Sequence, residues 1–77
     1  MKISIISFGV IHEILESTII ETDNAITVAQ LRELLETDFP VLKEMHFRFA
    51  LNKKMAMEDA IIQDGDTIAL MPPFSGG

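Results

Sequence analysis

The C-terminal segment Pro73-Phe74-Ser75-Gly76-Gly77 holds the residues whose chemistry is easiest to define. Its two final glycines have no side chain, so this backbone can approach a second protein closely and adopt torsions that other residues resist. The reactive group would be the carboxylate of Gly77. A carboxylate at neutral pH is a poor electrophile, because its charge repels nucleophiles. Activation as a mixed anhydride with AMP would let a sulfur donor attack and leave a thiocarboxylate.

The same segment is long enough to carry that group to a partner protein. If extended, residues 73–77 reach roughly 17 Å at about 3.4 Å per residue. Pro72 and Pro73 stiffen the exit from the preceding strand, and Phe74 offers an aromatic anchor of the kind found at interfaces. The alternative is a frayed terminus whose glycines have no role. Two glycines alone do not exclude that alternative.

The remaining side chains form no recognisable catalytic constellation. His12 and His46 are not at ligand spacing on one element, and the sequence has no HExxH motif, Gly-rich phosphate loop or GxSxG motif. We expect both histidines at the surface or partly buried. Asp64 and Asp66 flank Gly65, as a tight turn requires, rather than forming a metal or acid-base pair. No bound cofactor and no metal site are therefore expected.

Composition narrows the class of protein. The 77 residues are 48% hydrophobic, which predicts one globular domain. There is no cysteine, so disulfides, thiolate metal sites and cysteine nucleophiles are excluded. A formal charge of −6 with few aromatic residues argues against nucleic-acid binding and makes a basic partner the easier expectation. No apolar stretch approaches the roughly 18 residues of a membrane span, so we expect a cytoplasmic protein with no membrane partner.

The elements that must position the C-terminal segment can be predicted from hydrophobic periodicity. Residues 2–8 predict a buried strand, with Ile3 and Ile5 on one face. A short irregular or helical piece over 12–16 follows, and the β-branched residues of 18–20 predict a second strand. The chain thus opens with two strands.

A helix is predicted next. Thr27 and Gln30 have the spacing of a capping box, so the helix should begin at Val28, and Pro40 should end it nearby. Its apolar stripe is predicted to contain four residues: Val28, Leu31, Leu34 and Leu35.

Three further strands are predicted after the helix. Residues 47–51 alternate in side-chain character, and a tight reversal at 52–53 leads into a strand over 54–57. The turn at 64–66 precedes a last strand over 67–71. Three methionines at strand positions are expected to fill gaps in the core or lie on the sheet face: Met55, Met57 and Met71.

The predicted order is strand, strand, helix, strand, strand, strand. This order indicates an α+β fold of the ubiquitin-like β-grasp type, a mixed five-stranded sheet with one main helix on one face. If the first and last strands are central and parallel neighbours, the long connection through the helix supplies the crossover that parallel pairing needs. We expect residues 1–72 to form this domain and residues 73–77 to form an extended tail.

Over essentially its whole length the sequence resembles the MoaD-like small sulfur-carrier subunits of molybdopterin synthase, which are ubiquitin-like β-grasp proteins. The resemblance depends above all on the ending Leu70-Met71-Pro72-Pro73-Phe74-Ser75-Gly76-Gly77, which is specific. Three shorter matches support it: Phe8-Gly9, Ala50-Leu51-Asn52 and Asp64-Gly65-Asp66.

The resemblance implies that an E1-like enzyme uses ATP to adenylate Gly77, and that a sulfur donor system converts it to a thiocarboxylate. The large synthase subunit would then use this sulfur on cyclic pyranopterin monophosphate, making molybdopterin for the molybdenum cofactor. Gly76 would give a slender approach, and Pro73, Phe74 and Ser75 would contact the partners. The chain would be a carrier and not an enzyme by itself. Synthases of this family are typically heterotetramers of two small and two large subunits.

Two other readings stay open at this point. One is a carrier of the same kind in another pathway, thiamine or cysteine synthesis, or a ubiquitin-like modifier attached to lysines. The other is a β-grasp interaction module that binds through its sheet face and uses no terminal chemistry. The double proline followed by an aromatic residue, serine and two glycines favours the molybdopterin pathway.

Overall fold

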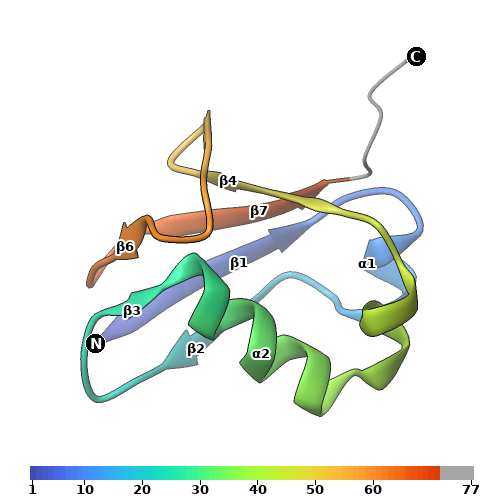
Figure 1. Ribbon diagram of the computed structural model, residues 1–77, viewed down its shortest axis with the longest axis horizontal. Coiled ribbons are helices and arrows are strands. Elements are labelled where there is room, and N and C mark those ends of the chain that lie inside the picture. Colours follow the sequence, from blue (N-terminus) through green and yellow to red (C-terminus); the bar gives the residue numbers. More distant parts are fainter. Residues whose placement is uncertain (72–77) are drawn as a thin grey trace.

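The computed structural model describes residues 1–71, which form a mixed sheet with the main helix packed across one face (Figure 1). All five residues of the predicted tail, 73–77, lie outside the described residues. The boundary between domain and tail therefore stays a prediction.

The main sheet has five strands in the spatial order β2-β1-β7-β4-β5. Their bounds are β1 Lys2–Ser7, β2 Thr18–Glu21, β4 Arg48–Leu51, β5 Lys54–Met55 and β7 Thr67–Met71. The main helix α2 spans Val28–Asp38. The smaller elements are the one-turn helix α1 (Ile11–Ile14), the 3-10 helix η1 (Pro40–Glu44), and a two-stranded sheet of β3 (Ile26–Thr27) and β6 (Ile61–Ile62).

Strand β7 lies at the centre of the main sheet, parallel to β1 and antiparallel to β4. The parallel register pairs Ser4 with Thr67 and Ser7 with Leu70. The expectation that the first and last strands are parallel neighbours is therefore confirmed. A parallel pair needs a long crossover connection, and here the chain between the two strands contains α2.

Helix α2 begins where the sequence predicts. The Thr27 hydroxyl accepts a hydrogen bond from the Gln30 backbone N–H at 3.1 Å, and Gln30 Oε1 accepts one from the Thr27 N–H at 2.9 Å. Both halves of the capping box are present. The helix ends at Asp38, because Phe39 before Pro40 has left helical torsions with φ at −132°.

We expect Thr27→Ala to lower the free energy of unfolding by about 1 kcal/mol, because the Gln30 N–H loses its side-chain acceptor. Urea denaturation followed by circular dichroism measures this. Thr27→Ser keeps the hydroxyl and is the control, expected to stay near the wild-type value. A loss in the serine variant as large as in the alanine variant would contradict the capping role.

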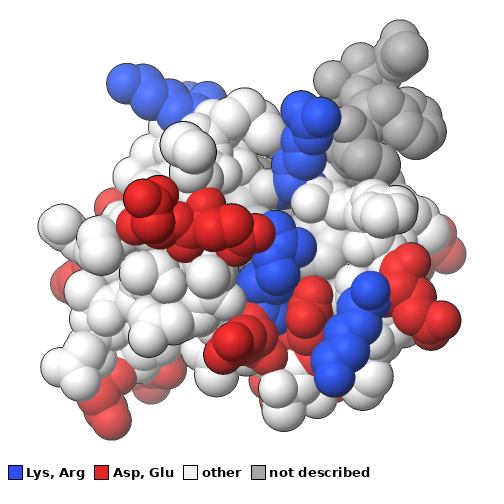
Figure 2. All heavy atoms as spheres, in the orientation of Figure 1, with Lys and Arg blue, Asp and Glu red and all other residues white. Residues whose placement is uncertain are grey.

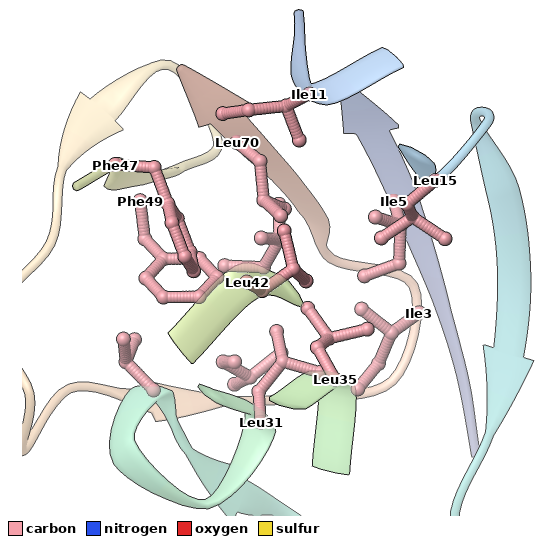
Figure 3. Packing of buried hydrophobic residues seen from close by; sticks show 13 residues of the cluster. Ile3, Ile5, Ile11, Leu15, Leu31, Leu35, Leu42, Phe47, Phe49 and Leu70 are labelled. Atoms are coloured by element: carbon pink, nitrogen blue, oxygen red, sulfur yellow. The ribbon is translucent and has the colours of Figure 1, made fainter. Parts of the chain in front are cut away.

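The core lies between α2 and the sheet face that it covers (Figure 3). From β1 it takes Ile3 and Ile5, as the predicted alternation requires, and from β7 it takes Ile68 and Leu70. Arg32 covers one side of this core. Its guanidinium lies 5.0 Å and 4.9 Å from the ring centres of Phe47 and Phe49, and it forms an ion pair with Glu58 at 2.9 Å.

The predicted stripe on α2 was wrong at one position. Val28, Leu31 and Leu35 are buried, but 47% of Leu34 is exposed. The physical reason is helix geometry: consecutive residues point about 100° apart, so Leu34 cannot face the core beside Leu35. It lies at the edge of the buried stripe.

Candidate functional site

The structure describes the strand that precedes the five predicted site residues, and those residues themselves (Pro73, Phe74, Ser75, Gly76 and Gly77) are outside the described part. The last described residue is Met71, at the end of the central strand β7. It pairs with Arg48 of β4, and on the other side the Phe8 N–H donates to the Leu70 carbonyl at 3.2 Å. The end of β7 is thus held between two neighbouring segments of the sheet.

The sheet face opposite α2, which we call the open face, is apolar near this exit. A row of cross-strand neighbours runs over it: Ile6 pairs with Ala69, Ala69 with Ala50, and Ala50 with Met55. Side chains alternate between the two faces of a strand, so these residues point away from the core that their neighbours build. The sheet therefore has a second apolar face, on the side opposite the helix.

The open face is hollowed into a groove of about 560 Å³. Two alanines, Ala50 and Ala69, supply small side chains at its centre, while Phe8 and Met55 remain 48% and 56% exposed. The full lining of this open-face groove is Ile6, Phe8, Ala50, Asn52, Lys53, Met55, Thr67, Ala69 and Met71. An exposed apolar hollow of this kind marks a binding surface more often than an ordinary stretch of protein surface does.

The hairpin that borders the groove has the predicted two-residue turn. Asn52 and Lys53 have φ values of 49° and 74°, which is the left-handed pair that a tight type I′ hairpin needs. Asn52 is well suited to this conformation and also joins the hairpin to β7. Its N–H donates to the Thr67 carbonyl at 2.8 Å, and its Oδ1 accepts from the Thr67 N–H at 2.9 Å.

Asp64 and Asp66 serve the turn before β7, as predicted. Asp64 Oδ1 accepts from the Lys2 N–H at 2.6 Å, and Asp66 Oδ2 accepts from the Gln63 N–H at 2.8 Å. Asp66 Oδ1 also accepts from Asn52 Nδ2 at 3.1 Å. These bonds tie both carboxylates to the backbone and the neighbouring hairpin. Within residues 1–71 no group of three or more His, Cys, Asp or Glu side chains is placed to hold a metal ion.

The segment after β1 is held by a small polar network around Ser7. The buried Ser7 hydroxyl donates to the Leu15 carbonyl, and His12 Nδ1 lies 3.0 Å from the same oxygen. Since the only hydroxyl proton goes to Leu15, His12 Nδ1 must carry a proton and donate to Ser7. This network closes the loop that follows Phe8, so His12 has the ordinary structural role expected for it.

The methionines differ in part from expectation. Met55 and Met71 lie on the sheet face beside the groove, which was one of the two predicted locations. Met57 is 76% exposed and outside any strand, so the prediction for it was wrong. The reason is that β5 ends at Met55, and the chain turns at Met57, whose carbonyl accepts from the Ala60 N–H at 3.0 Å.

In the part of the chain that the structure covers, no helix is long and apolar enough to cross a membrane. The groove itself was not predicted, because its lining comes from four strands, the residue after β1 and the turn between β4 and β5. Its sequence signal was the apolar residues at the outward positions of the strands, Ile6 in β1 and Met55 in β5.

Comparisons with known proteins agree with this architecture. A molybdopterin synthase sulfur carrier subunit of Mycobacterium tuberculosis is 27% identical over 82 residues, covering 100% of this chain and 99% of the relative. In the structure of a complex of subunits 1 and 2 of molybdopterin-converting factor from Helicobacter pylori, a chain is 30% identical with a TM-score of 0.72, and the match covers 100% of both chains.

Two solved structures with lower identity share the β-grasp fold. One is a Pyrococcus furiosus protein with a TM-score of 0.86 and 20% identity, matched over 95% of this chain and 98% of that chain. The other is small archaeal modifier protein 1 of Haloferax volcanii, with a TM-score of 0.79, 20% identity and the same coverage. The model of the ThiS family matches residues 5–77. The chain therefore belongs to the ThiS family of small, non-catalytic sulfur-carrier proteins.

Proposed function

We propose that this chain is the sulfur carrier of molybdopterin synthesis and donates sulfur from a thiocarboxylate at Gly77. The observation that carries the proposal is the match, at 30% identity over the full length of both chains, to a chain in a molybdopterin-converting factor complex. The M. tuberculosis relative, which is matched through its own length, supports the same pathway. The ending with two prolines, an aromatic residue, serine and two glycines agrees with it.

In the proposed reaction the Gly77 carboxylate attacks the α-phosphorus of ATP in the E1-like enzyme, and pyrophosphate leaves. A sulfide-level donor then attacks the acyl carbon, and AMP leaves with the electrons of its bond to carbon. The product is a thiocarboxylate, a soft nucleophile that the large synthase subunit uses on cyclic pyranopterin monophosphate. Gly76 gives the tail a slender end, while Pro73, Phe74 and Ser75 contact both partners. Because activation consumes ATP, we place the protein in the cytoplasm.

The described residues would contribute the docking surface. The open-face groove includes Met71, the residue from which the tail continues, and Phe8 beside it. A partner that binds the groove is therefore held next to the tail, and its active site must lie within the tail's reach of roughly 17 Å. Binding energy from the body would in this way orient a reactive group that the body itself does not touch.

Intact-mass analysis after incubation with ATP, the activating enzyme and a sulfur source tests the proposal. We expect the mass gain of one oxygen-to-sulfur exchange, localised to Gly77 by fragmentation, and no gain in a chain that lacks Gly77. Absence of adenylate and thiocarboxylate with every activating enzyme of the same cell would leave the non-covalent binding module. A thiocarboxylate that the large synthase subunit cannot use would instead favour the thiamine, cysteine or modifier pathways.

A further inference from the structure

We propose that the free edge of β2 binds an extended, positively charged segment of another protein, which adds to the main sheet as a further strand. Strand β2 (Thr18–Glu21) is the outermost strand of the sheet, and within residues 1–71 it pairs only with β1. The proposal goes beyond the proposed function, because it needs neither the tail nor the thiocarboxylate. It assigns an interaction surface and the chemistry of the partner that fits it.

The free edge of β2 presents backbone groups that have no partner in the sheet. The Met1 amino group donates to the Thr22 carbonyl at 2.7 Å, and the Thr22 N–H donates to the Met1 carbonyl at 2.9 Å. Hydrogen-bonded pairs alternate along an antiparallel ladder, so Ile20 directs its N–H and C=O to β1, while Ile19 and Glu21 direct theirs outward. A segment that lies along this edge can therefore form hydrogen bonds with both outward residues.

The two edges of the main sheet differ in how well they are protected against an added strand. Native edge strands are usually short or carry lysine, because unpaired backbone groups invite a further strand. The edge strand β5 has both features, since it consists of Lys54 and Met55. The other edge strand, β2, has four residues without lysine or proline, and 62% of Ile19 is exposed. The β2 edge is thus the one that can accept a strand.

The charge around β2 indicates which kind of strand fits. Residues 13–24, which contain β2, include no lysine or arginine but four exposed carboxylate residues: Glu13, Glu16, Glu21 and Asp23. Lys2 lies opposite Glu21 on β1, but the one ion pair between side chains of the described residues joins Arg32 and Glu58. A segment that carries lysine or arginine would be attracted to this edge and steered onto it.

The same charge argues against a second copy of this chain as the occupant. Two copies paired through β2 would bring identical surfaces together. The Glu21 side chain of each copy would then approach the carboxylates of the other, and like charges on neighbouring strands are destabilising. Figure 2 shows red side chains and no blue ones at the lower left of the visible face, where β2 lies in Figure 1. A basic partner meets this charge without such repulsion.

The register predicts a short sequence pattern in the partner. In the antiparallel arrangement, which is slightly more stable per residue, the partner residue opposite Glu21 comes two positions before the one opposite Ile19. Both side chains stand on the face away from α2, because Ile20 between them packs against the core. A basic residue suits Glu21, and a β-branched apolar residue suits Ile19. The expected pattern is therefore basic, any residue, apolar.

Amide exchange measured by NMR on the full chain tests the proposal, with the capped peptide Thr-Arg-Thr-Lys-Thr-Val-Thr as the probe. At a peptide concentration tenfold above the dissociation constant, about one molecule in eleven is free, so exchange of the Ile19 and Glu21 N–H groups should slow about tenfold. The Ile20 N–H already faces β1 and should change little. A control peptide with glutamate in place of arginine and lysine should bind at least tenfold more weakly at low salt.

Two N-methylated peptides separate backbone pairing from attraction by charge. Methylation of the lysine nitrogen removes the N–H that would donate to the Glu21 carbonyl, so we expect at least a tenfold loss of affinity. Methylation of the threonine between lysine and valine removes an N–H that would point away from β2, so the affinity should stay near that of the parent peptide. Both methylated peptides carry the same charge, and neither changes the protein.

Charge reversal in the protein tests the electrostatic part. Glu21→Lys and Glu44→Lys change the charge equally at exposed residues, but only Glu21 is on β2. We expect Glu21→Lys to weaken binding of the basic peptide about tenfold at low salt and to strengthen binding of the acidic control peptide. Glu44→Lys should leave both affinities near the wild-type values. Chemical-shift titration with each peptide measures these affinities.

Several results would overturn the proposal. Unchanged exchange of Ile19 and Glu21 up to the solubility limit of the peptide would exclude an added strand, as would equal losses for the two methylated peptides. Equal affinities for the basic and acidic peptides would exclude selection by charge. Slow exchange of both amides without peptide, becoming slower at higher protein concentration, would assign the edge to a second copy. Thiocarboxylate formation is measured without peptide, so its absence would contradict the sulfur carrier and leave the β2 edge in place.

Discussion

Adding one alanine after Gly77 is expected to abolish thiocarboxylate formation while leaving the fold and partner binding intact. The added residue moves the carboxylate by about 3.4 Å and places a methyl group beside the reacting carbon. Misplacement of a reacting group by about 1 Å can cost about 100-fold in rate, so a loss of at least that size is expected. The measurement is the rate of sulfur incorporation by intact mass, at a saturating concentration of the activating enzyme.

Two further variants separate the causes of that loss. Adding a glycine after Gly77 changes the length alone, and Gly77→Ala adds the methyl group alone. Both should keep wild-type affinity in surface plasmon resonance, because the described docking residues are unchanged. Sulfur incorporation by the extended chain at the wild-type rate would contradict a reactive carboxylate at Gly77, and this is the behaviour that a non-covalent interaction module predicts.

The fold could be predicted from the sequence because its signals are local and agree with one another. The capping box at Thr27 and Gln30 fixed the start of the main helix, and the turn at 64–66 fixed the start of β7. The alternation over β1 put Ile3 and Ile5 in the core. Once one helix stands between parallel first and last strands, few arrangements other than a β-grasp remain.

The features that were missed depend on contacts between distant segments. Strands β3 and β6 have two residues each, too few to show a period, and they pair Ile26 with Ile62. The same region supplies the Glu58 and Ala60 carbonyls that accept from the first backbone N–H groups of α2, each at 3.0 Å. No spacing along the sequence reveals such a partnership.

The candidate site likewise has one part that could be predicted from the sequence and one part that could not. The chemistry of the tail could be inferred from residue types, because glycine has no side chain and two terminal glycines are narrow whatever residues surround them. The open-face groove could not, because its floor joins Ala50 and Ala69 only through the register of β4 with β7. A surface property needs the fold before it can be assigned.

Leu31→Ala and Leu34→Ala are expected to differ strongly in stability, although both remove the same atoms from the same helix. Leu31 has no exposed surface, while Leu34 is 47% exposed. Replacing the buried leucine leaves a cavity and should lower the free energy of unfolding by about 3 kcal/mol. Replacing the exposed one should cost about 0.5 kcal/mol or less, as is usual for surface positions.

For a domain of this size a loss of about 3 kcal/mol is a large share of a total stability of about 5–10 kcal/mol. Urea denaturation of both variants, analysed with a common slope, measures the difference. Nearly equal losses would mean that α2 packs through a wider stripe that includes Leu34, as the sequence alone suggested. A large loss confined to Leu31 would instead confirm the narrow stripe through which α2 packs on the sheet face that contains the core residues of β1 and β7.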